Sequence, residues 1–540
     1  MAPNTTSNST DNGTLFVGGT VAAGPKQVPQ KNFAIYVSDG LIREVGPAAE
    51  LRARHASAKV TDAAGATILP GLTDAHGHLY SLGQSLDTVN LMETQSLDEV
   101  IARVRERAAR AQPGEWILGR GWDQNDWPVK EFPTAAQLDA ALPNNPVWIT
   151  RVDGHAGLAN TAALRAAGVL ANVQDPEGGK VLRDPAGAPS GVFIDAAQDL
   201  VERAIPKPTF AQVKARVLAS AQQIAKNGLT EMHDAGADDE TIRAIRELID
   251  ENQFPIRVYV MLSDDAKLLE TWLQKGPLVD YGGHLTVRAI KAYADGALGS
   301  RGAALLAPYS DDPTNTGLML ATTEHLEQVA RRALAGGFQL NTHAIGDRGT
   351  RNVIDAYERA GTSAKYRFRI EHLQVIAPSD IPRLVQRGII ASMQPTHATS
   401  DMYWAEQRLG SERILGAYAW RTVLDAGGRL ALGSDFPVED VNPFFGIHAA
   451  VTRQDKKNWP EGGWYPKQRL TLAEAVRGFT SDAAYAAFEE ASRGTIEPGK
   501  LADFTIVEGD FYTMPVSDLW KTKVRQTVVG GAIVYDANTR

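Results

Sequence analysis

The feature that most constrains the fold is a succession of short apolar runs that alternate with helical patterns. Eight runs are candidate strands, at 67–76, 229–233, 257–262, 287–294, 338–343, 368–372, 389–394 and 430–435. Helical patterns such as 324–335 and 380–387 separate most of them. Alternation of strand and helix argues for a parallel sheet, and eight repeats indicate an α/β (β/α)₈ barrel. A doubly wound sheet is the competing fold, but no glycine-rich phosphate loop follows the first strand.

The two ends of the chain have a different pattern, in which short β-like runs alternate with turns. We expect residues 14–65 and 490–540 to form one composite β-sandwich domain, with the barrel between them at 66–489. Residues 79–227 are too many for a loop and contain their own helical (97–111) and strand (147–150) patterns. We therefore expect an inserted subdomain after barrel strand 1, on the active-site face. Residues 1–13 are expected to be a disordered lead-in.

Composition excludes several classes of function. The chain of 540 residues contains no cysteine, so any metal must be bound by nitrogen and oxygen ligands. The net charge of -9 is dispersed, with no long basic run, so we expect neither nucleic acid nor a membrane as a partner. The lead-in lacks the apolar core of a signal peptide. We expect a cytoplasmic protein as the sequence stands, and a periplasmic or secreted one if an export signal has been removed.

Two histidines, His76 and His78, lie one residue apart at the end of the first candidate strand. Because side chains alternate along a strand, both histidines point to the same side. Paired imidazoles at a strand end are suitable ligands for Zn²⁺ and similar ions. By itself a His-x-His pair is more often a surface or core feature than a metal site.

Other potential ligands recur at the ends of later candidate strands, namely Lys291, His343, His372 and Asp435. Singly, each has an ordinary explanation: a core histidine, a lysine that reaches the surface, or an aspartate that caps a helix. The spacing of His343, His372 and Asp435 nevertheless fits one and then two strand–helix units. Together these residues predict a metal centre at the C-terminal ends of the barrel strands.

This order of residues along the barrel resembles that of the amidohydrolase superfamily. The flanking segments 69–76 (LPGLTDAH) and 494–503 (GTIEPGKLAD) are similar to those of the superfamily. Four further segments resemble the branch of N-substituted formamide deformylases and YtcJ-like proteins, namely 119–123 (GRGWD), 153–156 (DGHA), 295–301 (DGALGSR) and 433–437 (GSDFP). The resemblance extends from about residue 14 to residue 535.

The resemblance implies two divalent metal ions, most often Zn²⁺, and a lysine carboxylated by CO₂. His76, His78 and Asp435 would bind one ion, His343 and His372 the other, and carboxylated Lys291 would bridge them. The implied reaction is hydrolysis of a C–N bond in an amide, N-substituted formamide or related carbonyl compound by a metal-activated hydroxide. Asp435 would act as general base and then as general acid.

The candidates for binding substrate or stabilising the tetrahedral oxyanion are Trp122, through its indole N–H, together with His155 and Arg301. His233 and His397 are further candidates for the pocket. Glu371 and Asn341 would orient the metal-binding histidines. The aromatic residues Trp122, Trp127, Tyr403, Trp404, Trp464 and Tyr465 suggest a small-molecule substrate with an apolar or aromatic portion. A homodimer is the expected assembly if the chain self-associates. A lactonase, carbamate hydrolase or deaminase on the same scaffold, and a non-catalytic binding relative, are the alternatives.

Overall fold

The computed structural model describes residues 13–24, 26–140, 142, 144–151, 154, 156–171, 173–176 and 179–539. The chain divides into two compact units, and each is described by itself. The first combines Met1–Leu79 with Val217–Arg540, and the second is Tyr80–Arg216. Over the described parts of both units, no helix has the length and apolar character needed to cross a bilayer.

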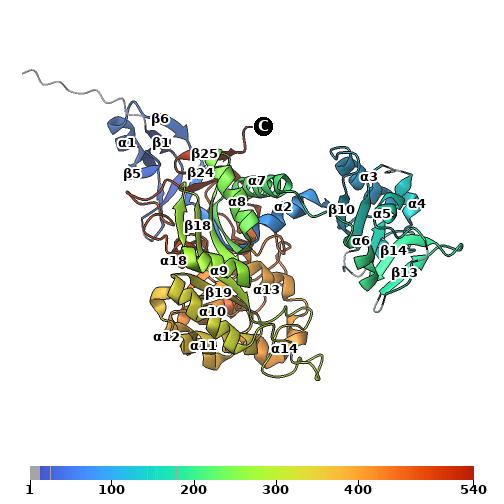
Figure 1. Cartoon of the computed structure of the whole chain (residues 1–540). Coiled ribbons are helices and arrows are strands. Elements are labelled where there is room, and N and C mark those ends of the chain that lie inside the picture. Colours follow the sequence, from blue (N-terminus) through green and yellow to red (C-terminus); the bar gives the residue numbers. More distant parts are fainter. Residues whose placement is uncertain are drawn as a thin grey trace, which may run out of the picture. The chain divides into compact units, whose positions relative to one another are not determined.

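Eight parallel strands of the first unit form a nearly closed barrel (Figure 1). They are β8 (Leu72–Gly77), β15 (Leu229–Ala237), β16 (Arg257–Ser263), β18 (Leu285–Tyr293), β19 (Gln339–Ala344), β20 (Arg369–His372), β21 (Ile390–Met393) and β22 (Leu430–Leu432). Each strand pairs with the next of this series. The ends of the sheet meet where Asp435 N–H donates to His76 O at 2.7 Å and His78 N–H donates to Phe436 O at 2.9 Å. The predicted (β/α)₈ barrel is therefore confirmed.

Helices follow most of the barrel strands, and α10 (Thr323–Gly336) shows why its sequence forms one. Thr322 Oγ1 accepts the His325 amide at the start, and Gly337 ends the helix in a left-handed conformation. Its buried residues Leu326, Val329, Ala330 and Ala333 share one face. The other helices of the C-terminal segment are α8 (Asp239–Asp250), α9 (Ala266–Lys275), α11 (Asp347–Ala360), α12 (Ile381–Arg387), α13 (Pro395–Asp401), α14 (Ala405–Arg413), α15 (Trp420–Asp425), α16 (Pro443–Thr452), α17 (Leu472–Gly478) and α18 (Ser481–Ala486).

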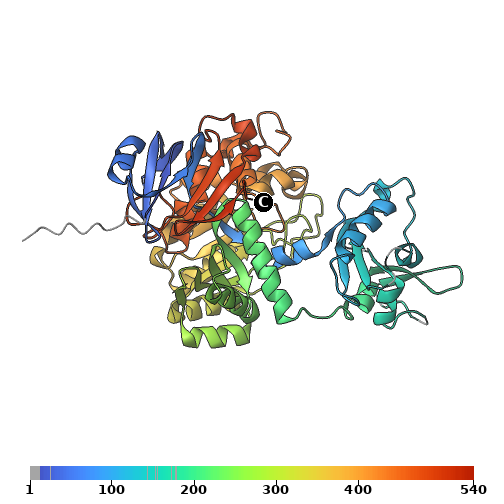
Figure 2. The ribbon, with the colours of Figure 1, turned by 90° about the horizontal axis from the view of Figure 1, so that it is seen from above.

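The chain ends form two further sheets of the first unit. One has the order β5-β4-β1-β6 and contains N-terminal strands alone, whereas the other has the order β25-β24-β23-β7-β2-β3 and combines strands of both ends. Figure 2 shows the blue N-terminal strands beside the red C-terminal ones, and the rings of Phe16 and Phe504 meet edge to face. The strands and the accompanying helix are β1 (Thr14–Val17), β2 (Thr20–Ala23), β3 (Val28–Lys31), β4 (Phe33–Ser38), β5 (Leu41–Pro47), α1 (Ala48–Arg54), β6 (Lys59–Asp62), β7 (Ala66–Pro70), β23 (Phe504–Glu508), β24 (Val524–Val529) and β25 (Ala532–Asp536).

The β-like run at the start of the chain, 14–21, and the predicted strand 67–76 each consist of two strands. Each division has a local cause. Within 14–21, Gly18 and Gly19 adopt φ of 90° and 87°, which breaks the run into β1 and β2 in different sheets. The run 67–76 divides at Pro70–Gly71 into β7, which pairs with β23, and β8, which belongs to the barrel. Gly71 permits this change of sheet because a Cβ there would lie 2.2 Å from Thr230 Oγ1.

The second unit is inserted in the sequence between β8 and β15. It contains a sheet of order β13-β14-β12-β11-β10-β9. The strands are β9 (Val89–Asn90), β10 (Ile117–Trp122), β11 (Val147–Arg151), β12 (Ala156–Ala159), β13 (Gly179–Arg183) and β14 (Pro189–Asp195). The helices of this part of the chain are α2 (Leu79–Asp87), α3 (Leu97–Ala108), α4 (Ala135–Asp139), α5 (Thr161–Ala166), α6 (Asp199–Glu202) and α7 (Phe210–Lys226).

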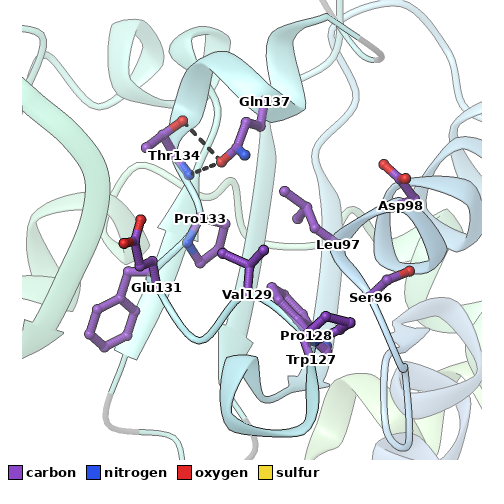
Figure 3. A pocket seen from close by; sticks show the side chains of 11 residues that line it. Ser96, Leu97, Asp98, Trp127, Pro128, Val129, Glu131, Pro133, Thr134 and Gln137 are labelled. Carbon is purple, nitrogen blue, oxygen red and sulfur yellow. Dashed lines mark hydrogen bonds between the residues drawn. The ribbon is translucent and has the colours of Figure 1, made fainter.

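A cavity of about 580 Å³ lies in the second unit, between the start of α3 and the segment that leads into α4 (Figure 3). Trp127, Pro128 and Val129 supply apolar surface to it. The Thr134 amide and hydroxyl both donate to Gln137 Oε1, which holds the beginning of α4. The described residues that line this cavity include no histidine, so it does not match the predicted metal centre.

Candidate metal centre

Polar side chains gather at the C-terminal ends of the barrel strands around a cavity of about 420 Å³. The expected metal ligands that line this cavity are His78, Lys291, His343, His372 and Asp435. His76 is completely buried beside them. Parallel strands bring their C-terminal ends to one edge, so residues far apart in sequence meet there.

His76 presents its Nε2 atom to this cluster because its other ring nitrogen already has a partner. Its Nδ1–H donates to Glu371 Oε2 at 2.5 Å, as expected for a residue that orients a ligand. The Nε2 atom lies 3.3 Å from Lys291 Nζ and 3.5 Å from Asp435 Oδ1. Burial, together with the Lys291 charge, holds the pKa of His76 well below its usual value. The ring is therefore neutral near pH 7, with a lone pair on Nε2.

Asp435 turns its two carboxylate oxygens toward different histidines. Its Oδ1 lies 3.0 Å from His78 Nε2, whereas its Oδ2 lies 3.5 Å from His397 Nε2. The backbone of Asp435 has φ of 65°, in the left-handed region that is costly for a residue with a side chain. Such strained conformations are concentrated at functional sites, where the surrounding structure holds them.

Asp74 holds the Asp435 segment against β8. Its carboxylate accepts the His76 amide at 3.0 Å, the Ser434 amide at 3.1 Å and the Ser434 hydroxyl at 2.7 Å. Burial raises the pKa of Asp74 to about 7. We assigned no role to Asp74 from the sequence, although its position two residues before His76 in β8 was the available signal.

Lys291 is buried inside the barrel and forms no ion pair with a described carboxylate. Its exposed fraction is 1%, and its contact with His76 Nε2 is the hydrogen bond that the described structure gives its Nζ. Nζ also lies 4.9 Å from the centre of the Tyr293 ring. Burial lowers the pKa of Lys291 from its usual value. A buried amine in this situation favours its neutral form.

His343 and His372 lie face to edge, with ring centres 4.5 Å apart. The Nδ1–H of His372 donates to Gln394 Oε1 at 2.8 Å, and Gln394 Nε2 in turn donates to Ser392 O at 3.4 Å. The Nε2 lone pair of His372 is thereby left for another partner. Burial and Lys291 lower the pKa of His343 to about 3, so this ring is also neutral near pH 7. His343 Nε2 is buried and has no hydrogen-bond partner among the described residues.

The Asp295 carboxylate links the loop after β18 to the residues that directly follow β19. Its carboxylate accepts three backbone amides, those of Ala304 at 2.8 Å, Ile345 at 2.9 Å and Gly346 at 2.8 Å. Its Oδ1 is 3.8 Å from His343 Nε2. Burial raises the pKa of Asp295 to about 7. This network holds the backbone that follows His343 against the loop after β18.

His397 joins the cluster from α13, which directly follows β21. Its ring is stacked near that of His372, with centres 5.9 Å apart and planes 20° apart. Single ligand atoms of His372, His397 and Asp435 lie within 4.8 Å of one another, as do those of His76, His78 and Asp435. The sequence analysis gives His397 only as a candidate for the pocket. The expected metal ligands lie at the ends of barrel strands, whereas His397 lies in a helix.

The comparisons with known proteins agree with this geometry. The family model described as "Amidohydrolase family" matches residues 59–535. The chain belongs to the amidohydrolase family. "Putative amidohydrolase YtcJ" of Bacillus subtilis is 32% identical over 93% of this chain and 96% of its own length, and "N-substituted formamide deformylase" of Arthrobacter pascens is 27% identical over 93% and 95%. The crystal structure of an uncharacterized metal-dependent hydrolase from Pyrococcus furiosus has a TM-score of 0.76 and 26% identity, covering 92% of this chain and 99% of that chain.

This amidohydrolase is a metal-dependent hydrolase, and its donor set fits a metal. Neutral imidazoles and carboxylates are the ligands that first-row divalent ions prefer in a site without thiolates. The orphaned, buried Nε2 atom of His343 is the kind of atom that an ion would satisfy. The two clusters of potential ligands share Asp435, which places both at the same cavity.

The residues expected to bind substrate lie elsewhere or outside the described residues. Trp122 was expected to use its indole N–H in the pocket, but this side chain is fully buried in the second unit and donates to Ile149 O at 3.0 Å. The surrounding glycine, aspartate and asparagine residues suggest a pocket residue, whereas Trp122 ends strand β10 and packs in the core of the second unit. Arg301 pairs with Asp311 and does not line the cavity. His155 lies outside the described residues.

Three other expectations differ from the structure of this amidohydrolase. Of the aromatic residues expected near the barrel mouth, Trp404 lines the cavity, and the unexpected Tyr293 joins it. His233 does not line the cavity, because its Nδ1 accepts from the buried Arg369 guanidinium at 2.9 Å. The amide of Asn341 is buried and has no partner among the described residues, so its geometry does not show it orienting a histidine.

Proposed function

We propose that this amidohydrolase cleaves a C–N bond next to a carbonyl group, in an amide, an N-substituted formamide or a related compound. The observation that carries the proposal is the set of histidines and one shared carboxylate around a single cavity, with a buried lysine that forms no ion pair with a described carboxylate. The similarity to a protein named N-substituted formamide deformylase supports the choice of bond.

The proposed centre is binuclear. One ion would be held by His76, His78 and Asp435, a second ion by His343 and His372, and both by Lys291 once it carries a carboxylate. Two such cations, when bound, supply a water of lowered pKa and an electrophile that polarises the substrate carbonyl. Zn²⁺ is the ion we expect, although manganese, iron, cobalt and nickel use the same ligand types.

We propose that Lys291 becomes carboxylated, which its environment favours. The lone pair of the neutral amine attacks the carbon of CO₂, an N–C bond forms as one C–O π bond opens to an oxyanion, and the nitrogen loses one proton to solvent water, which leaves an anionic carbamate. Burial favours the neutral amine that this step needs. Lys291 faces His76 Nε2, so the new carboxylate would be introduced among the ligands.

Asp435 is proposed to move the proton. As the water oxygen bonds to the carbonyl carbon, Asp435 accepts the proton that the water loses. It then gives this proton to the nitrogen as the C–N bond breaks, so the products are a carboxylic acid and an amine. The position of Oδ1, 3.0 Å from His78 Nε2, keeps the carboxylate at the centre of the cluster.

The walls of the cavity suggest a substrate with an apolar portion. The apolar residues that line the cavity include Leu298, Ile345, Trp404 and Val438. Apolar walls around a few polar groups are usual for small-molecule sites. We therefore propose N-substituted amides or formamides with an apolar or aromatic substituent, in preference to small charged compounds.

The proposal is tested by metal content and hydrolysis, measured together on wild type and Lys291→Ala. Lys457→Ala is the matched control because Lys457 is exposed. The substrate panel contains formamides and amides with benzyl or alkyl substituents and, for the lactonase alternative, aryl and alkyl lactones. We expect about two ions per chain and amide hydrolysis in wild type and control, with both lost in Lys291→Ala.

Other outcomes would change the proposal in specific ways. Metal content that does not depend on Lys291 would remove its bridging role. Turnover of lactones alone would move the activity to C–O bonds on the same scaffold. A metal-loaded wild type that hydrolyses no member of the panel would favour the non-catalytic alternative.

A further inference from the structure

One ring nitrogen at the cavity has no hydrogen-bond partner among the described residues and belongs to a residue that the proposed mechanism does not use. His397 lines the cavity with an exposed fraction of only 7%. Its Nε2 atom is buried and makes no hydrogen bond within the described structure. The nearest carboxylate oxygen, Asp435 Oδ2, is 3.5 Å away, which is longer than a good N–H···O hydrogen bond. A buried polar atom of this kind calls for a partner that is not part of the chain.

The hydrogen-bond partner of the other ring nitrogen, Nδ1, indicates whether Nε2 of His397 carries a proton or a lone pair. Gln374 Nε2 lies 3.1 Å from His397 Nδ1, and an amide nitrogen can only donate. Nδ1 of a neutral His397 must then be the acceptor, so the proton is on Nε2. His397 consequently directs an N–H group toward the cavity.

His372, in the same cluster, has its ring proton on the opposite nitrogen. Its Nδ1 lies against an amide oxygen, Gln394 Oε1, so Nδ1 carries the proton and Nε2 carries a lone pair. Gln394 is held in this orientation by its Nε2 contact with Ser392 O. Two histidines with nearly parallel rings thus face the cavity with opposite groups, one suited to bind a cation and the other to bind an anion.

We infer that His397 is a catalytic hydrogen-bond donor whose Nε2–H binds the oxygen that becomes negative when water adds to the substrate carbonyl. Gln374 is the positioning residue that keeps the proton on that nitrogen. The inference rests on the proposed hydrolysis, because the oxyanion arises in that reaction. Hydrogen-bond donors fixed in advance and aimed at a developing oxyanion are among the largest contributions to acyl transfer.

The competing role for His397 is that of a metal ligand with His372 and Asp435, whose ligand atoms are close enough. That role needs a lone pair on Nε2 and therefore a reversed Gln374 amide. The two roles give different results when metal content is measured, because removal of a ligand lowers metal content and removal of a hydrogen-bond donor does not.

The test uses His397→Ala and His397→Gln in the metal-loaded full-length protein, with His325→Ala as control because His325 is exposed on α10. We expect His397→Ala to lower kcat about 10²- to 10³-fold, with KM little changed, as for the loss of one oxyanion donor. His397→Gln keeps an N–H donor and should recover part of kcat. Metal content should equal that of wild type in all three variants.

Gln374→Glu tests the position of the proton. A carboxylate accepts from Nδ1, as Glu371 does from His76, and so moves the proton away from Nε2. We expect kcat of Gln374→Glu to fall nearly as far as that of His397→Ala. Gln374→Met removes the partner without imposing the wrong proton position, so a smaller loss is expected.

A phosphinate that mimics the tetrahedral intermediate gives a readout without turnover. Its affinity, measured by calorimetry, should fall in His397→Ala by the same factor as kcat. Loss of metal from His397→Ala, or unchanged kcat and phosphinate affinity, would overturn the inference. If wild type hydrolyses no amide, the proposed function fails, whereas the phosphinate and metal measurements still decide the role of His397.

Discussion

Replacement of Glu371 tests whether the orientation of His76 sets metal affinity. Glu371 and His76 are both completely buried, and the Nδ1–H···Oε2 distance is 2.5 Å. Glu371→Ala removes the acceptor and leaves a buried N–H unpaired, which costs about 1–3 kcal/mol. Loss of such an outer partner typically lowers metal affinity 10- to 100-fold, or about 1.4–2.7 kcal/mol. The first cost lowers the stability of the protein with or without metal, whereas the second gives the expected result for binding, a 10- to 100-fold weaker metal affinity.

Glu371→Gln separates the hydrogen bond from the charge. Its amide oxygen can still accept from His76 Nδ1, so we expect a loss of about tenfold, at the lower end of that range. The assay is competition between the chelator-stripped protein and a colorimetric zinc chelator. Glu270→Gln on the exposed face of α9 is the control. Wild-type affinity in Glu371→Ala would refute the idea that the Glu371 contact prepares His76 to bind an ion.

Three further predictions concern the groups that support the cluster. Asp74→Ala removes the acceptor of the Ser434 amide and hydroxyl, and should lower both the thermal midpoint and kcat, measured by calorimetry and turnover, because the Asp435 segment is freed. Asp295 has a pKa raised to about 7, so its contribution to stability is present below about pH 4 and lost as pH rises through about 7. Wild type should therefore lose stability relative to Asp295→Asn across that range in urea unfolding of the metal-free protein. Gly77→Ala places a Cβ 2.5 Å from the Phe436 ring and should reduce metal content, measured by elemental analysis, by displacing His76 and His78.

The barrel could be predicted because its strands are buried on both faces and read as apolar runs that end in polar residues. β22 shows this pattern clearly, since Leu430–Leu432 is apolar and buried throughout and Asp435 follows it closely. For the same reason the expected ligands could be assigned to the C-terminal edge before any geometry was known. The division at Pro70–Gly71 could not be predicted in this way, because β7 and β8 are both completely buried. Nothing in the apolar pattern distinguishes one sheet from the other.

The residues that were misplaced are those whose role depends on partners distant in sequence. Trp122 has polar neighbours that suggest a pocket residue, yet its indole N–H donates to Ile149 O across the strand pair β10–β11. Asp74, in the predicted strand 67–76, and Asp295 show no role until the amides that donate to them are known. Hydrogen bonds between residues far apart in the sequence do not produce a periodic pattern from which they could be predicted.

For each histidine of the cavity, the hydrogen-bond partner of Nδ1 determines whether Nε2 carries a lone pair or a proton. This partner distinguishes the histidines more clearly than their positions in the sequence do. His76 faces a carboxylate and His372 an amide oxygen, so both keep a lone pair on Nε2. His397 faces an amide nitrogen, so it keeps a proton there. A site that must bind both a cation and an anionic intermediate needs both kinds of histidine. Because a glutamine can present either end of its amide, two glutamines, Gln374 and Gln394, are sufficient to assign the two roles.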